Sequence, residues 1–270
     1  MMRRLEGKYI AITGASKGLG RQLALDFARE GAGGIALVAR HADRLYQVRE
    51  EIRALSPRTR VLALAADLRD TKAVESVSAA LLSEFQGRLD VLVNNASTVG
   101  PSPMPYLLDY PLEEFRRVLD TNLIAPFLLT RKLLPAMIEN GGAVINVTSD
   151  AGVTGYSGWG AYGISKFGLE GLSQTWAREL EGAGIRVNRV DPGNMDTDMH
   201  RAAEPDEDPT QWADPAAVTE VFLFLASDAS RGVTGRRFQA QEDWRAVADE
   251  ALRESAAEAA PEAEPAGREG

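Results

Sequence analysis

The stretch that decides the fold is "YIAITGASKGLGRQLALDFARE", residues 9–30. It predicts an apolar strand over 9–13, a glycine-rich turn, and a helix over about 18–30. Glycines let backbone N–H groups approach an anion, and the amino end of the helix offers unpaired donors and a partial positive charge. The turn therefore predicts a pyrophosphate site, although its G-x-x-x-G-x-G spacing differs from G-x-G-x-x-G and glycines can also serve turn geometry alone. The residues assigned to this site are Gly14, Ser16, Lys17, Gly18, Leu19 and Gly20.

Apolar runs and helical patterns alternate along most of the chain. Further predicted strands cover 35–39, 61–65, 90–94, 143–148 and 185–190, with a short last one in 233–240. Further predicted helices cover about 42–55, 71–86, 113–139, 160–182 and 214–230. The strands are almost continuously apolar, as in parallel strands that are covered on both faces. This alternation predicts an α/β fold: a single Rossmann-type, doubly wound parallel sheet with helices on both faces.

The predicted domain spans 1–245, and the remaining segment, 246–270, is rich in Ala, Glu and Pro. That segment has almost no large apolar residues after 252, so we predict a disordered tail, with a charged helical extension as the alternative.

Composition excludes several classes of function. The 270 residues carry a net charge of −9, which argues against nucleic acid as the partner. The chain has no cysteine, which excludes thiol chemistry and zinc-thiolate sites. Only two histidines occur, His41 and His200, and both are predicted to lie at the surface, so no metal site is expected. No apolar run is long enough for a signal peptide or a membrane span, and we expect a cytoplasmic protein.

The end of the second predicted strand indicates which dinucleotide binds. An NAD site usually has an acid about 20 residues after the glycines, to bind the ribose 2′-hydroxyl. Here the strand ends in Arg40, which can hold a 2′-phosphate, and Lys17 can add a second positive charge. Asp43 is the competing acid, but it comes three residues later, at the predicted start of a helix. The pattern favours NADP(H) over NAD(H).

Three further residues suggest proton chemistry. Ser149 ends a predicted strand, where parallel α/β folds bind their ligands, and Tyr162 and Lys166 lie four residues apart on one helix face. A nearby ammonium favours a phenolate, so we expect Lys166 to lower the pKa of Tyr162. Tyr162 can then donate a proton to a carbonyl oxygen that the Ser149 hydroxyl holds.

Seven motifs occur in the order found in the short-chain dehydrogenases/reductases, and the chain resembles that family over residues 8 to about 240. The motifs are "TGASKGLG" (13–20), "DL" (67–68), "NNAS" (94–97), Asn122 in "DTNLIAPF", Ser149, "YGISK" (162–166) and "PGNMDT" (192–197). Each motif alone has an ordinary structural explanation, as a turn or a helix cap, but their conjunction is specific.

The resemblance implies a role for each matching residue. Ser149 orients the substrate oxygen, Tyr162 is the general acid in reduction and the base in oxidation, and Lys166 also binds the nicotinamide ribose. Asn122 holds a water that links Lys166 to solvent as a proton relay. The cofactor residues implied beside the glycine turn are Asp67 and Leu68 at the adenine, Asn94 and Ala96 along the adenosine, and Pro192, Gly193 and Thr197 at the nicotinamide.

Two departures from the family pattern qualify these expectations. Ser97 stands where the family usually has glycine, and it would be strained if that position required a positive φ. The family often closes with an Asp-Gly-Gly that contributes to a subunit interface, and "VTGRRFQAQEDWRAV" has no such glycine pair. We still expect a homodimer or homotetramer, but the usual tetramer is in doubt.

The sequence thus predicts an NADP(H)-dependent oxidoreductase that interconverts a carbonyl and an alcohol. The substrate can be a 3-oxoacyl thioester, a ketone, an aldehyde or a sugar-derived carbonyl. A catalytically inactive NADP(H)-binding regulator or scaffold is the alternative from another class. A serine hydrolase built on Ser149 is disfavoured, because the chain has no suitable histidine and no nucleophile elbow.

Overall fold

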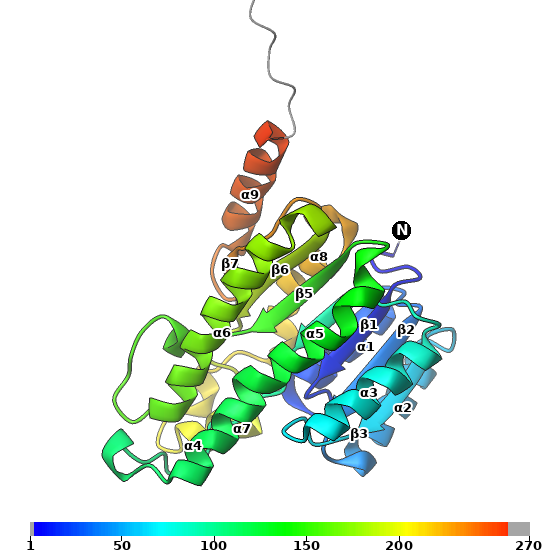
Figure 1. Ribbon diagram of the computed structural model, residues 1–270. Helices are drawn as coiled ribbons and strands as arrows, with labels where there is room; N and C mark the ends of the chain where they lie inside the picture. The colour runs from blue at the N-terminus through cyan, green and yellow to red at the C-terminus, as the bar shows by residue number, and fades with distance from the viewer. Residues whose placement is uncertain (1–2, 259–270) are drawn as a thin grey trace, which may run out of the picture.

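In the computed structural model, which describes residues 3–258, seven parallel strands form one sheet in the order β3-β2-β1-β4-β5-β6-β7 (Figure 1). The strands are β1 (Tyr9–Thr13), β2 (Gly34–Ala39), β3 (Arg60–Ala65), β4 (Val91–Asn94), β5 (Gly142–Val147), β6 (Ile185–Asp191) and β7 (Arg237–Gln239). The sheet grows outward in opposite directions from β1 and β4, so the predicted doubly wound parallel sheet is confirmed.

Helices cover both faces of the sheet, as predicted (Figure 1). One layer consists of α1 (Gly18–Arg29), α2 (Ala42–Leu55), α8 (Glu220–Ala226) and α9 (Trp244–Glu258). The other consists of α3 (Thr71–Glu84), α5 (Ala125–Ile138) and the end of α6 (Gly160–Glu179). Within residues 3–258, no helix combines the length and the apolar composition that crossing a membrane requires.

The central strand shows why its sequence is apolar throughout. Ile10 and Ile12 pack into the core on one face of the sheet, whereas Ala11 packs into the core on the other. All three side chains are fully buried. Because successive side chains alternate between faces, a strand covered on both sides needs apolar residues at every position.

The helix predicted over 113–139 is interrupted in the structure. It consists of α4 (Leu112–Leu119), a π-helical turn η2 (Asp120–Ile124) and α5. In the wider turn, the N–H of Ala125 bonds to the carbonyl of Asp120, five residues earlier. Pro126 follows at the start of α5 and has no N–H to offer to the carbonyl of Asn122, four residues earlier, which explains why the regular pattern breaks here.

The prediction that the tail begins at 246 is wrong, because residues 244–258 form α9. Trp244, Ala248 and Ala251 lie on one face of this helix and are buried, and the Trp244 ring lies 5.5 Å from the ring of Phe224 in α8. One tryptophan and two alanines at helical spacing are enough to bury one face of this helix. The low content of large apolar residues in the sequence did not indicate this. Residues 259–270 lie outside the described part of the chain.

Candidate active site

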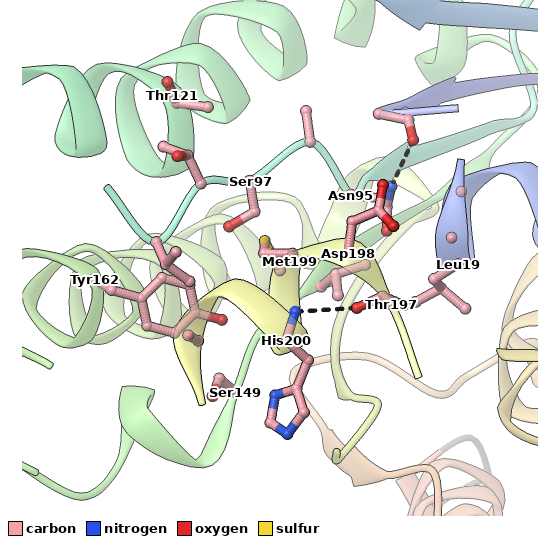
Figure 2. A pocket seen from close by; sticks show the side chains of 18 of the residues that line it. Leu19, Asn95, Ser97, Thr121, Ser149, Tyr162, Thr197, Asp198, Met199 and His200 are labelled. Carbon is pink, nitrogen blue, oxygen red and sulfur yellow. Dashed lines mark hydrogen bonds between the residues drawn. The ribbon is translucent and has the colours of Figure 1, made fainter. Parts of the chain in front are cut away.

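The carboxyl ends of the strands surround a cavity of about 890 Å³. Figure 2 shows Leu19 and Thr197 together at the glycine turn, and Tyr162 and Ser149 at the opposite end. The predicted site residues that line the cavity are Gly14, Ser16, Lys17, Gly18, Leu19, Gly20, Arg40, Asp67, Leu68, Ala96, Ser149, Tyr162, Lys166, Pro192, Gly193 and Thr197. Of the predicted set, Asn94 and Asn122 do not line it.

Two glycines of the turn are required, one by its backbone conformation and the other by packing. Gly14 has a φ of +67°, which a side chain would strain. A Cβ at Gly20 would lie 2.4 Å from the carbonyl oxygen of Gly14 and 2.6 Å from the Nδ2 of Asn95. No side chain fits there, so Gly20 lets α1 begin directly against the turn. The Lys17 side chain does not cap α1, and within residues 3–258 the first N–H groups of the helix have no side-chain partner.

The prediction of Asn94 as a cofactor residue is corrected by the structure. The side chain of Asn94 is buried between the sheet and α5. Its Nδ2 donates to Thr130 Oγ1 of α5 at 3.1 Å and to Asn146 Oδ1 of β5 at 2.8 Å. The next residue, Asn95, lines the cavity and ties β4 to the turn, because its Nδ2 donates to the carbonyl of Thr13 at 2.8 Å. Side chains alternate between faces at a strand end, so only one of two adjacent asparagines can face the cavity.

The three predicted catalytic side chains converge at the end of β5. Tyr162 and Lys166 are 6% and 2% exposed, and the Lys166 Nζ lies 5.5 Å from the centre of the Tyr162 ring. This Nζ donates to the carbonyl of Val147 at 2.8 Å. The Ser149 hydroxyl donates to Asp150 Oδ1 at 2.8 Å and does not bond to an imidazole within residues 3–258, which removes support for a hydrolase triad.

Burial dominates the ionisation of the tyrosine and the lysine. It raises the pKa of Tyr162, with smaller contributions from the carboxylates of Asp191 and Asp150, while the Ser149 hydroxyl acts in the opposite direction. It lowers the pKa of Lys166 to about 8, against the opposing effect of Asp191 and Glu170. The direction of the Tyr162 shift is opposite to the expected lowering by Lys166, because desolvation dominates in the protein by itself.

Asn122 does not line the cavity but connects two segments that do. Its Oδ1 accepts from the N–H of Thr98 at 2.9 Å, and its Nδ2 donates to the carbonyl of Thr98 at 2.9 Å and to Ser165 Oγ at 3.0 Å. Asn122 therefore fixes the segment after β4, which lines the cavity, against the helix that bears Tyr162 and Lys166.

Ser97 is accommodated without backbone strain. Within residues 3–258, the only non-glycine residue with a positive φ is Gln86, so the position of Ser97 does not need glycine. Its side chain lines the cavity between Asn95 and Tyr162 (Figure 2), and its buried hydroxyl has no hydrogen-bond partner in the described residues.

At the other end of the cavity, the charges are exposed to solvent. Arg40 is exposed at the end of β2, and Asp43, the competing acid, does not line the cavity. The Lys17 Nζ forms an ion pair of 2.7 Å with Asp198, a partner that sequence spacing does not indicate. Hydrogen bonds from Arg69 hold the pKa of Asp67 below its usual value.

A segment after β6 covers the tyrosine, and it includes the short helix α7 (Asp198–Ala203). The prediction that His200 is a solvated loop residue is wrong: its side chain is 15% exposed, and its ring lies 4.4 Å from that of Trp212. Apolar side chains from this segment and from two others gather around Tyr162. They are Val99, Met104, Ala151, Trp159, Met199 and Ala203.

Known proteins match this chain over most of its length. The model of the short chain dehydrogenase family matches residues 8–208. The 3-oxoacyl-[acyl-carrier-protein] reductase FabG of Thermotoga maritima is 35% identical over 244 residues, which covers 86% of this chain and 96% of that protein. A short chain dehydrogenase structure from Pseudomonas syringae has a TM-score of 0.84 and 36% identity, covering 89% of this chain and 97% of that one. A short chain dehydrogenase from Escherichia coli CFT073 complexed with NADPH has a TM-score of 0.83 and 32% identity, covering 90% of this chain and all of that one.

Proposed function

The chain belongs to the short-chain dehydrogenase family and is an NAD(P)-dependent oxidoreductase, and we propose that it reduces a carbonyl compound with NADPH, with Tyr162 as the proton donor. The observation that carries the proposal is the convergence of three groups. Tyr162 lies in the cavity with the Ser149 hydroxyl on one side and the Lys166 ammonium behind its ring.

The cavity fits a dinucleotide in size and in the chemistry of its lining. It extends from Arg40 and Asp67, past the glycine turn, to Tyr162. The uncapped N–H groups at the start of α1 can hold a pyrophosphate, and Thr197 lies against Gly18 at the same turn. The relative from Escherichia coli CFT073 that was solved with NADPH has the same fold, which supports this assignment.

The preference for NADPH is supported by the charge at the end of β2. Arg40 stands where an NAD site usually has an acid, and it is exposed and lines the cavity, where its guanidinium can hold a 2′-phosphate. Lys17 contributes less than its sequence position suggests, because Asp198 already neutralises it.

In the proposed mechanism, the Ser149 hydroxyl holds the substrate carbonyl oxygen next to the Tyr162 hydroxyl. Bound NADPH would supply the hydride to the carbonyl carbon. Tyr162 donates its proton to the oxygen, and the positive charge of Lys166 stabilises the phenolate that remains. The raised pKa of Tyr162 keeps the phenol protonated before the reaction, which suits a general acid.

The proton relay through Asn122 stays a prediction. Its side-chain amide is engaged with Thr98 and Ser165. Its backbone carbonyl is a remaining acceptor for a water, because Pro126 cannot donate to it.

The surroundings of Tyr162 favour a carbonyl with an apolar substituent. The apolar cluster would stabilise an alkyl or aromatic group, and the indole N–H of Trp159 is the one strong hydrogen-bond donor that its members offer to the hydroxyls of a sugar. A 3-oxoacyl thioester is the second candidate, supported by the similarity to the 3-oxoacyl-[acyl-carrier-protein] reductase FabG of Thermotoga maritima.

A panel of carbonyl substrates tests the proposal, with the loss of NADPH absorbance as the readout. The panel contains aromatic ketones, aliphatic aldehydes, a 3-oxoacyl thioester and an open-chain sugar, and we expect turnover with apolar carbonyls and none with the sugar. Tight NADPH binding without turnover on any member would instead favour the inactive regulator or scaffold.

Self-association and a cytoplasmic location complete the proposal. Ile124 of η2 and Ile164 and Phe167 of α6 are each more than 40% exposed, which supports a second copy of this chain as the partner for that face. Size-exclusion chromatography with light scattering distinguishes a monomer from the homodimer or homotetramer that we propose.

A further inference from the structure

The last strand places an arginine against the catalytic groups. Arg237 lies in β7, and its side chain is 19% exposed. Its Nη2 donates to Asp191 Oδ2 at 2.8 Å and to the carbonyl of Ser149 at 3.2 Å, and its Nε donates to Glu170 Oε1 at 3.2 Å. One guanidinium thus joins the segment after β5, the end of β6 and the helix α6.

Both carboxylates that Arg237 binds also shape the site. Glu170 lies one helical turn after Lys166 on α6, and its Oε1 accepts from Thr148 Oγ1 at 2.7 Å. Asp191 accepts from the N–H of Gly193 at 2.9 Å, which fixes the Pro-Gly turn at the cavity. Glu170 and Asp191 are each 5% exposed, so their charges act at short range and with little screening.

The charges around the catalytic pair form a balanced set, in which Glu170, Asp191 and Arg189 are buried and Asp150 is exposed. Asp150, Glu170 and Asp191 face Tyr162 or Lys166 from η3 (Asp150–Gly152), α6 and β6. Arg237 binds two of these carboxylates, and Arg189 lies behind Glu170, with its Nε 3.3 Å from Glu170 Oε2. Removing one guanidinium would leave an uncompensated negative charge next to Lys166.

A second residue of the same segment supports a link between the chain's C-terminal part and the site. The Nε2 of Gln241 donates to the carbonyl of Pro192 at 2.9 Å and to that of Asn194 at 3.0 Å. The segment 237–241, which in this chain stands in place of the expected Asp-Gly-Gly, therefore holds the Pro-Gly turn from two sides.

We propose that Arg237 is a positioning residue of the active site, which fixes the backbone of Ser149, the turn after Asp191 and the carboxylate of Glu170 relative to one another. The proposal rests on the function proposed above, because it assigns Arg237 to the Ser149, Tyr162 and Lys166 machinery. Arg237 acts through these residues and does not itself line the cavity.

The test compares Arg237→Met with Arg237→Lys and with the control Arg236→Met. Arg236 is the preceding residue, does not line the cavity, and pairs with Glu254 of α9. The measurements are kcat and the pH profile of kcat/KM for NADPH. For Arg237→Met we expect kcat to fall about tenfold or more, because the Ser149 oxygen is displaced by a fraction of an ångström. We also expect the alkaline limb of the pH profile of Arg237→Met to move to higher pH, because the uncompensated carboxylates raise the pKa of Lys166.

Arg237→Lys should recover part of kcat and return the limb towards its original position, since it keeps the charge but not the fork of donors. Arg236→Met should match the unmodified enzyme in both measurements. The proposal is overturned if Arg237→Met has a kcat within about twofold of that of the unmodified enzyme and the alkaline limb of its pH profile does not move. A twofold change is below the smallest effect expected of a displaced catalytic group. If Arg237→Met does not fold, Arg237→Gln applies the same criteria, because it keeps hydrogen-bonding capacity and removes the charge.

Tyr162→Phe, measured in parallel, separates the two proposals. If Tyr162→Phe stays active, the proposed function fails. If Tyr162→Phe is inactive while the Arg237 variants behave like the unmodified enzyme, only the role of Arg237 fails.

Discussion

At one end of the cavity, Lys166 is 2% exposed and held by the carbonyl of Val147; at the other end, Arg40 is exposed to solvent. Buried charges interact strongly and depend on fixed partners, whereas exposed charges are screened by water and salt. We therefore expect the buried end to set the rate of the reaction and the exposed end to set the choice of cofactor. The predictions below test that division, from the largest expected effect to the smallest.

Tyr162→Phe should lower kcat by about 10³-fold or more, because it removes the proton donor. The Kd of NADPH, measured by fluorescence titration, should change little, since the phenyl ring still fills the same space. A variant that retains more than about a tenth of the original kcat would show that another group transfers the proton, because such a loss is smaller than general acid catalysis usually contributes.

The pH dependence should report Lys166. Burial lowers the pKa of Lys166 to about 8, so the ammonium is present below that pH and is lost above it. The raised pKa of Tyr162 keeps the phenol protonated over the same range. Because reduction needs the ammonium to stabilise the phenolate, kcat/KM for NADPH should fall about tenfold per pH unit above pH 8.

Lys166→Arg supplies the control for this profile. A guanidinium keeps its proton throughout the accessible range, so the alkaline limb should disappear up to about pH 10 even though activity at neutral pH is lower. A limb that remains in this variant would belong to a group other than Lys166.

Arg40→Asp tests the exposed end. The KM for NADPH should rise about 10- to 100-fold, as expected for the loss of a charge-assisted contact, while the KM for NADH changes little. Arg53→Asp makes the same change in charge at the last turn of α2, away from the cavity, and should leave both constants unaltered. Equal binding of the two cofactors by the unmodified enzyme would refute the role of Arg40.

Asp198→Asn should have the smallest effect. It releases Lys17 from its ion pair, so the KM for NADPH should fall by about two- to fivefold, in keeping with the low energy of an exposed pair. The side chains of both residues are at least half exposed. An increase in the KM for NADPH would mean that the pair holds α7 in place rather than competing with the phosphate.

The sequence alone predicted the sheet and the residues at the two ends of the cavity. The order of apolar runs predicted the sheet, with each of the first six strands correct to within one residue at either end. Ser149, Tyr162 and Lys166 were found because a strand end and a helical spacing of four residues place side chains predictably. Glycine spacing likewise indicated the turn before α1.

The features that the sequence did not reveal depend on contacts between distant segments or on the face of a strand to which a side chain points. Asn94 and Asn95 are chemically identical, and nothing local indicates which one faces the cavity. The pairing of Lys17 with Asp198 joins residues 181 positions apart. Nothing in the sequence distinguishes Glu170 and Arg237 from ordinary surface charges, because they meet only when β7 pairs with β6 in the sheet.

The measurement that tests the central claim most directly is kcat at saturating NADPH for Tyr162→Phe and Arg40→Asp in the same assay. The account predicts that kcat falls by about 10³-fold in Tyr162→Phe and stays within about twofold in Arg40→Asp, because only the buried end takes part in the proton transfer. A comparable loss of kcat in both variants would contradict the division between a catalytic end and a selective end.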